Sequence, residues 1–354
     1  MAKLFEPLQL GNIKLKNRIA VSPMCEYSSI DGFAADWHLV HLGSRAVGGA
    51  GLIIAEATAV SPEGRITPDD LGIWKDEHIS FLQRITSFIK EQGSVPGIQL
   101  AHAGRKASHQ SPWKGGQPLT KEEGAWQTVG PSAIAFKEGT PVPEALSKEG
   151  IRKVIDDFKA AATRALKAGF EVIEIHAAHG YLLHQFYSPL SNLRSDEHGG
   201  SFANRIRLTL EIVKDVKELL PQNFPLLVRI SATDWIDNGW TVEDSVELCK
   251  ELKKAGVHLV DCSSGGNASG ARIALGPMYQ TSFAARIKKE AGIMTGAVGL
   301  ITTATEAEGI LQNNEADLIL LARQLLRDPY FPLHAAKELG VDVAWPSQYL
   351  RAKN

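Results

Sequence analysis

Short apolar runs alternate with amphipathic segments along almost the whole chain. Eight such runs occupy residues 18–22, 51–57, 97–102, 170–175, 226–231, 257–262, 293–298 and 317–321. Between them, apolar residues recur on one helical face over 79–89, 151–165, 208–219 and 246–252. Continuously apolar runs are typical of parallel strands that are covered on both faces.

Eight strand–helix repeats predict an α/β fold, a (β/α)8 barrel, in a single domain over residues 1–354. The alternative is an open doubly wound sheet. That fold would normally carry a G-x-G-x-x-G fingerprint after an early strand, and the sequence has none. The nearest pattern, Gly-Gly-Ala-Gly at 48–51, precedes a strand instead of following one.

Two segments depart from the repeat. Residues 103–148 follow the third strand, lack sustained periodicity and are rich in Gly, Pro, Trp and Lys. A loop of that length in a compact domain is usually functional, so we expect it to cover an active site. The tail at about 343–354 carries Trp345, Tyr349 and Arg351. We expect it to pack on its own barrel or to reach a neighbouring subunit.

Composition narrows the class of protein. Of the 354 residues, 44% are apolar and the formal net charge is −2, so there is no excess of positive charge to attract nucleic acid or an anionic membrane. No window has the length of apolar residues needed to cross a bilayer. Three cysteines (Cys25, Cys249 and Cys262) are too few for a disulfide framework, which suits a reducing compartment. We therefore expect a cytoplasmic enzyme that acts on small molecules.

The end of the fourth run gathers titratable side chains. His176, His179 and Tyr181 lie within six residues, directly after the strand. Either histidine alone would more often be structural, but three such groups at one strand end favour function. Two imidazoles can donate hydrogen bonds to one oxygen of a carbonyl compound, and a phenol can give a proton. We expect no metal, because no third ligand stands at a matching position and the H-E-x-x-H pattern is absent.

Other strand ends also carry polar or small residues. Gln99 and Arg229 lie inside apolar runs and must find polar partners there. Gly299 and Arg323 follow the last two strands, where barrels of this kind usually bind phosphate. An ion pair at the barrel rim is the ordinary alternative for Arg323. Cys25 could equally be a small buried apolar residue.

Several longer motifs resemble the Old Yellow Enzyme family of flavin-dependent ene-reductases. They are Ser-Pro-Met-Cys at 22–25, Glu-Ala-Thr-Ala at 56–59, Gly-Ile-Gln-Leu-Ala-His-Ala-Gly-Arg-Lys at 97–106, and His-Ala-Ala-His-Gly-Tyr at 176–181. Two more stretches, at 188–201 and 323–329, continue the match in the same order. The resemblance covers essentially the whole chain. It is strongest to the bacterial branch of thermophilic-like enzymes and xenobiotic reductases, often called NADPH dehydrogenases.

The resemblance implies a noncovalent FMN at the carboxyl mouth of the barrel, with NADPH or NADH as the hydride donor. It implies ping-pong reduction of the C=C bond of α,β-unsaturated carbonyl or nitro compounds. By position, the isoalloxazine would contact Ser22, Pro23, Met24, Cys25, Ala57, Gln99 and Arg229, and the phosphate would contact Gly299, Ala322 and Arg323.

The resemblance also assigns the reacting groups. His176 and His179 would bind the substrate oxygen, Tyr181 would donate the proton, and Cys25 would tune the flavin. Tyr27 and Arg351 would help to bind the substrate. Arg351 would do so in the neighbouring subunit of a homodimer or homotetramer.

Two departures from the family pattern stand out. Ala322 stands where the family often has glycine; its backbone N–H survives the change, so phosphate binding should too if φ is negative there. The segment 109–128 is longer than in some relatives, which leaves the substrate range open.

Three other functions compete with this interpretation. Larger relatives reduce dienoyl-CoA or oxidise amines with an added iron–sulfur cluster, which needs a close cysteine cluster that this chain lacks. A flavin-free barrel lyase or isomerase would use the same phosphate site, but it normally places a Lys or a carboxylate at the barrel centre. A non-enzymatic binding protein would not need this set of strand-end residues.

Overall fold

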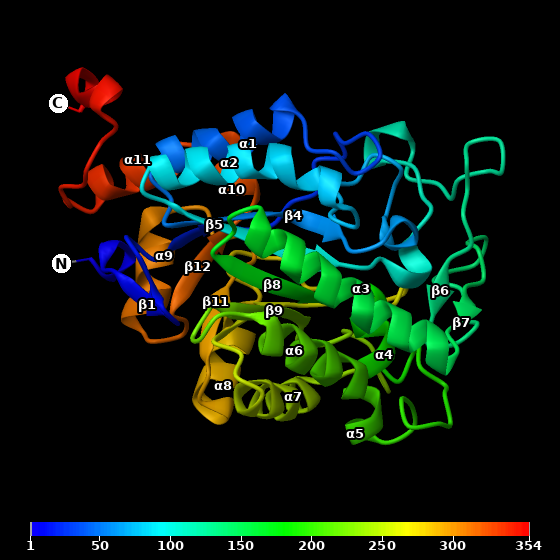
Figure 1. Ribbon diagram of the computed structural model, residues 1–354. Coiled ribbons are helices and arrows are strands. Elements are labelled where there is room, and N and C mark those ends of the chain that lie inside the picture. The colour runs from blue at the N-terminus through cyan, green and yellow to red at the C-terminus, as the bar shows by residue number, and fades with distance from the viewer. Residues whose placement is uncertain (1, 354) are drawn as a thin grey trace.

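The computed structural model describes residues 2–353. Its centre is a closed barrel of parallel strands (Figure 1). In the order of their pairing, the strands are β10 (Leu259–Ser263), β11 (Met294–Ala297), β12 (Leu318–Leu321), β3 (Ile19–Val21), β4 (Leu52–Ala59), β5 (Val95–Ala101), β8 (Val172–Ala177) and β9 (Leu226–Ser231). Each of the eight apolar runs forms one of these strands, so the predicted (β/α)8 barrel is confirmed.

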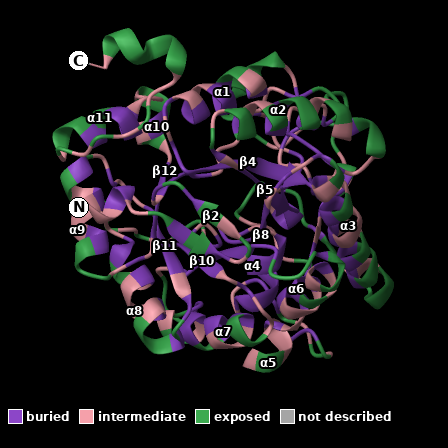
Figure 2. Cartoon of the chain, turned by 60° about the vertical axis from the view of Figure 1, so that its left-hand side comes forward, coloured by how far each residue is buried: buried purple, intermediate pink, exposed green. Residues whose placement is uncertain are grey.

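Helices surround the barrel, with buried faces inward and exposed faces outward (Figure 2). They are α1 (Asp36–Val47), α2 (Ile79–Glu91), α3 (Lys148–Lys167), α4 (Leu182–Tyr187), α5 (Phe202–Arg205), α6 (Arg207–Leu219), α7 (Val242–Lys254), α8 (Thr281–Ala291), α9 (Ala304–Gln312), α10 (Arg323–Arg327) and α11 (Phe331–Glu338). Helix α7 begins with a capping box: the Thr241 hydroxyl accepts the Asp244 N–H, and the Asp244 carboxylate accepts the Thr241 N–H.

A short antiparallel hairpin, β1 (Leu8–Leu10) and β2 (Ile13–Leu15), closes the amino-terminal end of the barrel. The hairpin residues Leu8, Leu10 and Leu15 pack against residues near the starts of the barrel strands. Leu52 and Val172, the first residues of β4 and β8, are among them. The sequence pattern does not predict this hairpin, because three-residue strands leave no measurable period. Because the hairpin closes this end, ligands can enter only at the carboxyl end of the strands, where this fold places its active sites.

The long segment after β5 and the tail lie on different sides of the molecule (Figure 1). Residues 103–148 contain the short 3-10 helices η4 (Gly104–Lys106) and η5 (Pro112–Lys114) and the two-residue strands β6 (Val129–Gly130) and β7 (Glu144–Ala145). The tail ends in the 3-10 helix η6 (Ser347–Ala352). Three more 3-10 helices, η1 (Lys3–Phe5), η2 (Pro62–Gly64) and η3 (Asp76–His78), complete the chain. Across residues 2–353, no helix is both long and apolar enough to span a membrane.

Candidate active site

The end of β8 and the turn after it bring His176, His179 and Tyr181 together: His176 lies in the strand itself, and the other two follow it. The His176 ring centroid lies 5.2 Å from that of His179 and 5.1 Å from that of Tyr181, both edge-on. His179 and Gly180 have φ values of 58° and 72°, so the chain reverses sharply between the two imidazoles and the phenol. A Cβ at Gly180 would lie 2.1 Å from the carbonyl oxygen of Gly266, so only glycine fits.

A buried hydrogen-bond network holds this turn from below. His184 Nδ1 accepts the Gly180 N–H at 2.9 Å, and its Nε2 lies 2.9 Å from Asp234 Oδ1. Asp234 Oδ2 accepts the Ser188 hydroxyl at 2.6 Å and the Trp240 N–H at 2.9 Å. His184 and Asp234 are both fully buried. Sequence reasoning missed this pair, because its members lie 50 positions apart and carry no spacing signal.

Lys106, in the predicted 97–106 motif, binds the turn from the other side. Its Nζ donates to the carbonyl oxygens of His179 at 2.8 Å and Gly266 at 3.0 Å, and it lies 5.1 Å from the centre of the Tyr181 ring. Burial, and then the neighbouring Arg105 charge, lower the pKa of Lys106 to about 8. The motif therefore joins the loops after β5, β8 and β10.

The two imidazoles are neutral. Burial first, and then the Arg229 charge, lower the pKa of His176 and of His179 well below the usual value. His176 Nδ1 accepts the Ala178 N–H at 3.3 Å, so its proton resides on Nε2. His179 Nε2 lies 2.7 Å from the Ser263 hydroxyl oxygen. Burial also raises the pKa of Tyr181 well above its usual value, so its phenol keeps its proton at neutral pH.

The segment after β3 lies beside this turn. Burial, followed by the Glu56 charge, raises the pKa of the partly exposed Cys25 thiol, which is therefore neutral. After burial, Cys25 and Tyr27 are the next causes that raise the pKa of Tyr181. Glu56, in β4, accepts the Glu26 N–H at 3.0 Å and fixes the segment to the barrel. Pro23 and Met24, in the same segment, are half-buried.

A layer of polar side chains lies inside the barrel below the mouth. Gln99 donates to Glu174 Oε1 at 2.8 Å, and Arg229 Nε lies 3.0 Å from Asp261 Oδ2. Burial and the Asp261 charge raise the pKa of Glu174 to about 8, against the opposing Arg229 charge. Gln99 and Arg229 thus have the polar partners that their place in apolar strands required. The carboxylates were missed, because a buried acid in a strand looks like an ordinary alternating polar residue.

The loops after β11 and β12 enclose a cavity of about 170 Å³. Gly299, Ala322, Arg323 and Arg229 line it, so it connects the expected phosphate residues to the polar layer. Ala322 has a φ of −102°, which lies outside the left-handed region that favours glycine, so the departure from glycine leaves its N–H in place. Gln280 closes one side and donates to the carbonyl oxygen of Val298 at 3.1 Å.

A family model described as the NADH:flavin oxidoreductase / NADH oxidase family matches residues 3–341. The chain belongs to this family. It is 52% identical to an NADPH dehydrogenase of Bacillus cytotoxicus, over 99% of this chain and 96% of the relative. It is 50% identical to an NADPH dehydrogenase of Bacillus subtilis, over 99% and 98%. Among solved structures, morphinone reductase matches with a TM-score of 0.79 at 28% identity, over 98% of this chain and 92% of that one.

These matches confirm the resemblance to the Old Yellow Enzyme family. The protein is an FMN-dependent oxidoreductase with NAD(P)H as the electron donor. The competing flavin-free lyase, isomerase and binding-protein interpretations are therefore wrong.

The donor set of this flavin oxidoreductase fits FMN. Ser22 Oγ is buried without a hydrogen-bond partner among the described residues. Arg229 and Gln99 supply a cation and an amide from the polar layer, and Ala57 pairs with Gln99 between β4 and β5. This set of a hydroxyl, an amide and a guanidinium can bind a planar ring with polar edges that carries a phosphate.

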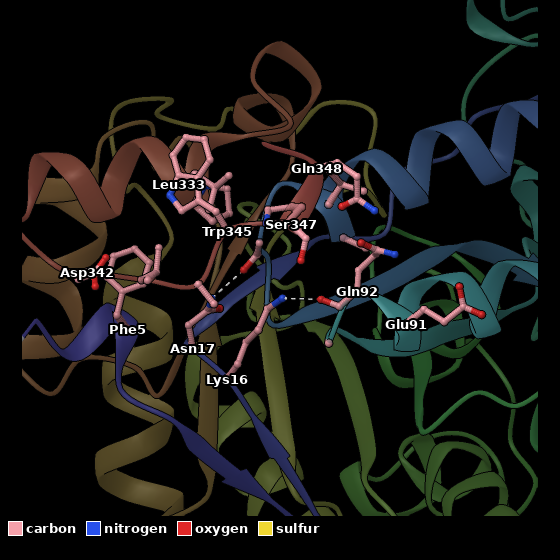
Figure 3. A pocket seen from close by; sticks show the side chains of 18 residues that line it. Phe5, Lys16, Asn17, Glu91, Gln92, Leu333, Asp342, Trp345, Ser347 and Gln348 are labelled. Atoms are coloured by element: carbon pink, nitrogen blue, oxygen red, sulfur yellow. Dashed lines mark hydrogen bonds between the residues drawn. The ribbon is translucent and has the colours of Figure 1, made fainter. Parts of the chain in front are cut away.

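Arg351 does not reach the mouth of its own barrel. It is exposed on η6, and the tail borders a separate hollow of about 670 Å³ (Figure 3). Lys16, Asn17, Gly49 and Gly93 also line this hollow. These four residues precede strands, which places the tail at the amino-terminal end of the barrel. Any contact between Arg351 and an active site must therefore involve another subunit.

Proposed function

We propose that this flavin oxidoreductase is an ene-reductase, which adds a hydride and a proton to the C=C bond of α,β-unsaturated carbonyl or nitro compounds. The observation that carries the proposal is the end of β8 and its following turn, where two neutral imidazoles and a protonated phenol lie about 5 Å apart. Hydride addition to a conjugated alkene places negative charge on the carbonyl oxygen. Preorganised N–H donors stabilise such a charge.

His176 and His179 would supply these donors. The Nε2–H of His176 follows from the contact of its Nδ1 with the Ala178 N–H. If the Ser263 hydroxyl donates to His179 Nε2, the proton of that imidazole resides on Nδ1 and is free for the substrate. Ser263 then gives up its longer contact of 3.4 Å to Gln280. Both donors are neutral, so they stabilise the oxygen without transferring a proton to it.

Tyr181 would protonate the α-carbon. Its raised pKa keeps the phenol protonated until the substrate accepts a proton. The Lys106 cation near its ring would stabilise the phenolate that remains. Tyr27 would hold the substrate from the opposite loop.

The cofactor would be held by Ser22 to Cys25, Ala57, Gln99 and Arg229 at its ring and by Gly299, Ala322 and Arg323 at its phosphate. When bound, FMN supplies hydride transfer between NAD(P)H and the alkene. Arg229 would place a positive charge against the ring edge that becomes electron-rich on reduction. Cys25, a neutral thiol, would tune the redox behaviour. NAD(P)H and alkene would use the same site in turn, in a ping-pong scheme.

We further propose a cytoplasmic homodimer or homotetramer in which Arg351 enters the active site of a neighbouring subunit. The exposed position of Arg351 at the far end of its own barrel supports this arrangement. Sedimentation analysis of the purified enzyme tests it, and a monomer at micromolar concentration would contradict it.

An absorbance experiment tests the central proposal. Purified protein should be yellow, bleach under anaerobic NADPH and regain its colour when 2-cyclohexenone is added. Bleaching without recovery on addition of the enone would show that NAD(P)H is oxidised but that the alkene is not a substrate, which would contradict ene-reduction.

A further inference from the structure

The segment 109–128 folds into an arch with a defined tip and base. Gln110 N–H donates to the carbonyl oxygen of Gln117 at 2.8 Å, and Leu119 N–H donates to that of Ser108 at 2.9 Å. The helix η5 forms the tip and carries Trp113. At the base, Trp126 Nε1 donates to the carbonyl oxygen of Glu63 at 3.0 Å.

Three contacts bind the arch to the wall of the active site. The Trp113 ring meets the Tyr27 ring edge-on at 5.6 Å, and Lys114 Nζ donates to Asp69 Oδ2 at 2.7 Å. His109 N–H donates to the carbonyl oxygen of Ile66 at 2.9 Å. Ile66 also borders a small cavity that Tyr181 lines. The segment that contains Ile66 therefore lies between the arch and Tyr181, the proposed proton donor.

Trp113 stays 66% exposed despite these contacts. A tryptophan that is held in place but not covered retains apolar area for a ligand. Tyr27, on which it rests, belongs to the segment that also carries Cys25. The exposed indole therefore lies beside a segment of the active site, where it is free to contact a group that extends outward from the alkene.

We propose that Trp113 is a specificity-determining residue that binds an aryl substituent of the alkene. This inference rests on the ene-reductase function proposed above. The indole would contact a planar ring conjugated to the C=C bond, while a small cyclic enone ends before reaching it. Lys114 and Asp69 hold the arch closed as a positioning pair.

The test compares two alkenes in the oxidative half-reaction of the NADPH-reduced holoenzyme. Trp113→Ala should weaken the apparent affinity for trans-cinnamaldehyde roughly five- to tenfold, as loss of an aromatic contact does, and leave 2-cyclohexenone unchanged. Trp113→Phe should retain most of the affinity for the aryl substrate. Lys114→Met should cost less than about threefold, because exposed ion pairs contribute little.

The outcomes separate the inference from the proposed function. Equal effects of Trp113→Ala on both alkenes, or no effect on either, would overturn the specificity role while ene-reduction stands. An equal slowing of flavin reduction by NADPH would assign the indole to the dinucleotide instead. A wild-type enzyme that reduces neither alkene would contradict the proposed function itself. An unchanged thermal midpoint for Trp113→Ala shows that the exposed side chain does not support the fold.

Discussion

The buried pair His184–Asp234 makes a prediction that joins stability to the active site. Burial by itself would raise the pKa of Asp234, but His184, Ser188 and the Trp240 N–H outweigh it and hold that pKa below its usual value. Asp234 Oδ2 accepts from Ser188 and Trp240, and Oδ1 lies 2.9 Å from His184 Nε2. Asp234→Asn replaces one of these oxygens with an N–H donor, so at least one buried donor must face another donor.

The size of the effect follows from these contacts. An unpaired buried donor costs about 1–3 kcal/mol, and loss of the charge weakens the remaining bonds. We expect Asp234→Asn to lower the free energy of unfolding by about 3 kcal/mol. With about 2.1 cal/mol/K per residue over 354 residues, this lowers the unfolding midpoint by roughly 4 °C. Differential scanning calorimetry measures the shift.

The same variant should impair the chemistry selectively. Without a fixed His184, Gly180 N–H loses its acceptor and the turn carrying His179 and Tyr181 loosens. We expect reoxidation of the reduced flavin by 2-cyclohexenone to slow about tenfold, because small misplacements of catalytic groups are costly. Reduction by NADPH should change less, because in the proposed mechanism Tyr181 acts only when the alkene is reduced.

Asp237→Asn is the matched control, since Asp237 is exposed in the same loop and the change removes the same charge. It should alter stability by less than about 0.5 kcal/mol. If the two variants behave alike in calorimetry and in both half-reactions, the buried network does not support the turn.

Three further predictions concern single residues of the site. Tyr181→Phe should slow alkene reduction but spare flavin reduction by NADPH in stopped-flow traces, and equal losses would exclude a proton-donor role. Arg323→Ala should weaken FMN binding roughly tenfold or more, because a hydrogen bond to a charged group contributes about 1.5–3 kcal/mol. Fluorescence of the released flavin measures the affinity. An unchanged affinity would show that Arg323 does not bind the phosphate. Glu174 has a raised pKa of about 8 in the folded state, so folding retains a proton there that the unfolded chain releases above about pH 4.5. The free energy of unfolding should therefore fall as pH rises through this window, by up to about 1.4 kcal/mol per pH unit. Urea unfolding at pH 5 and pH 8 measures this fall, and Glu174→Gln should reduce it. Equal falls in the wild type and the variant would contradict the burial argument.

The elements of the barrel could be predicted from local pattern alone. Parallel strands are covered on both faces, so each one must be an apolar run whatever its neighbours are. Helix boundaries were equally local, because Thr241 and Asp244 cap α7 through residues only three positions apart. The cluster at 176–181 was visible for the same reason: its members follow one strand, and a strand end of a barrel faces the site.

Tertiary structure alone decided how distant residues meet. Only the closed barrel brings together Gln99 with Glu174 and Arg229 with Asp261. The same holds for His184 with Asp234 and for Trp113 with Tyr27. The closing hairpin β1–β2 is of the same kind, since its leucines gain their burial from strands contributed by the rest of the chain. Local periodicity records which face of an element is buried, because burial selects side chains one element at a time. It does not record the partner across the core, because any apolar face or paired charge would satisfy the same local pattern.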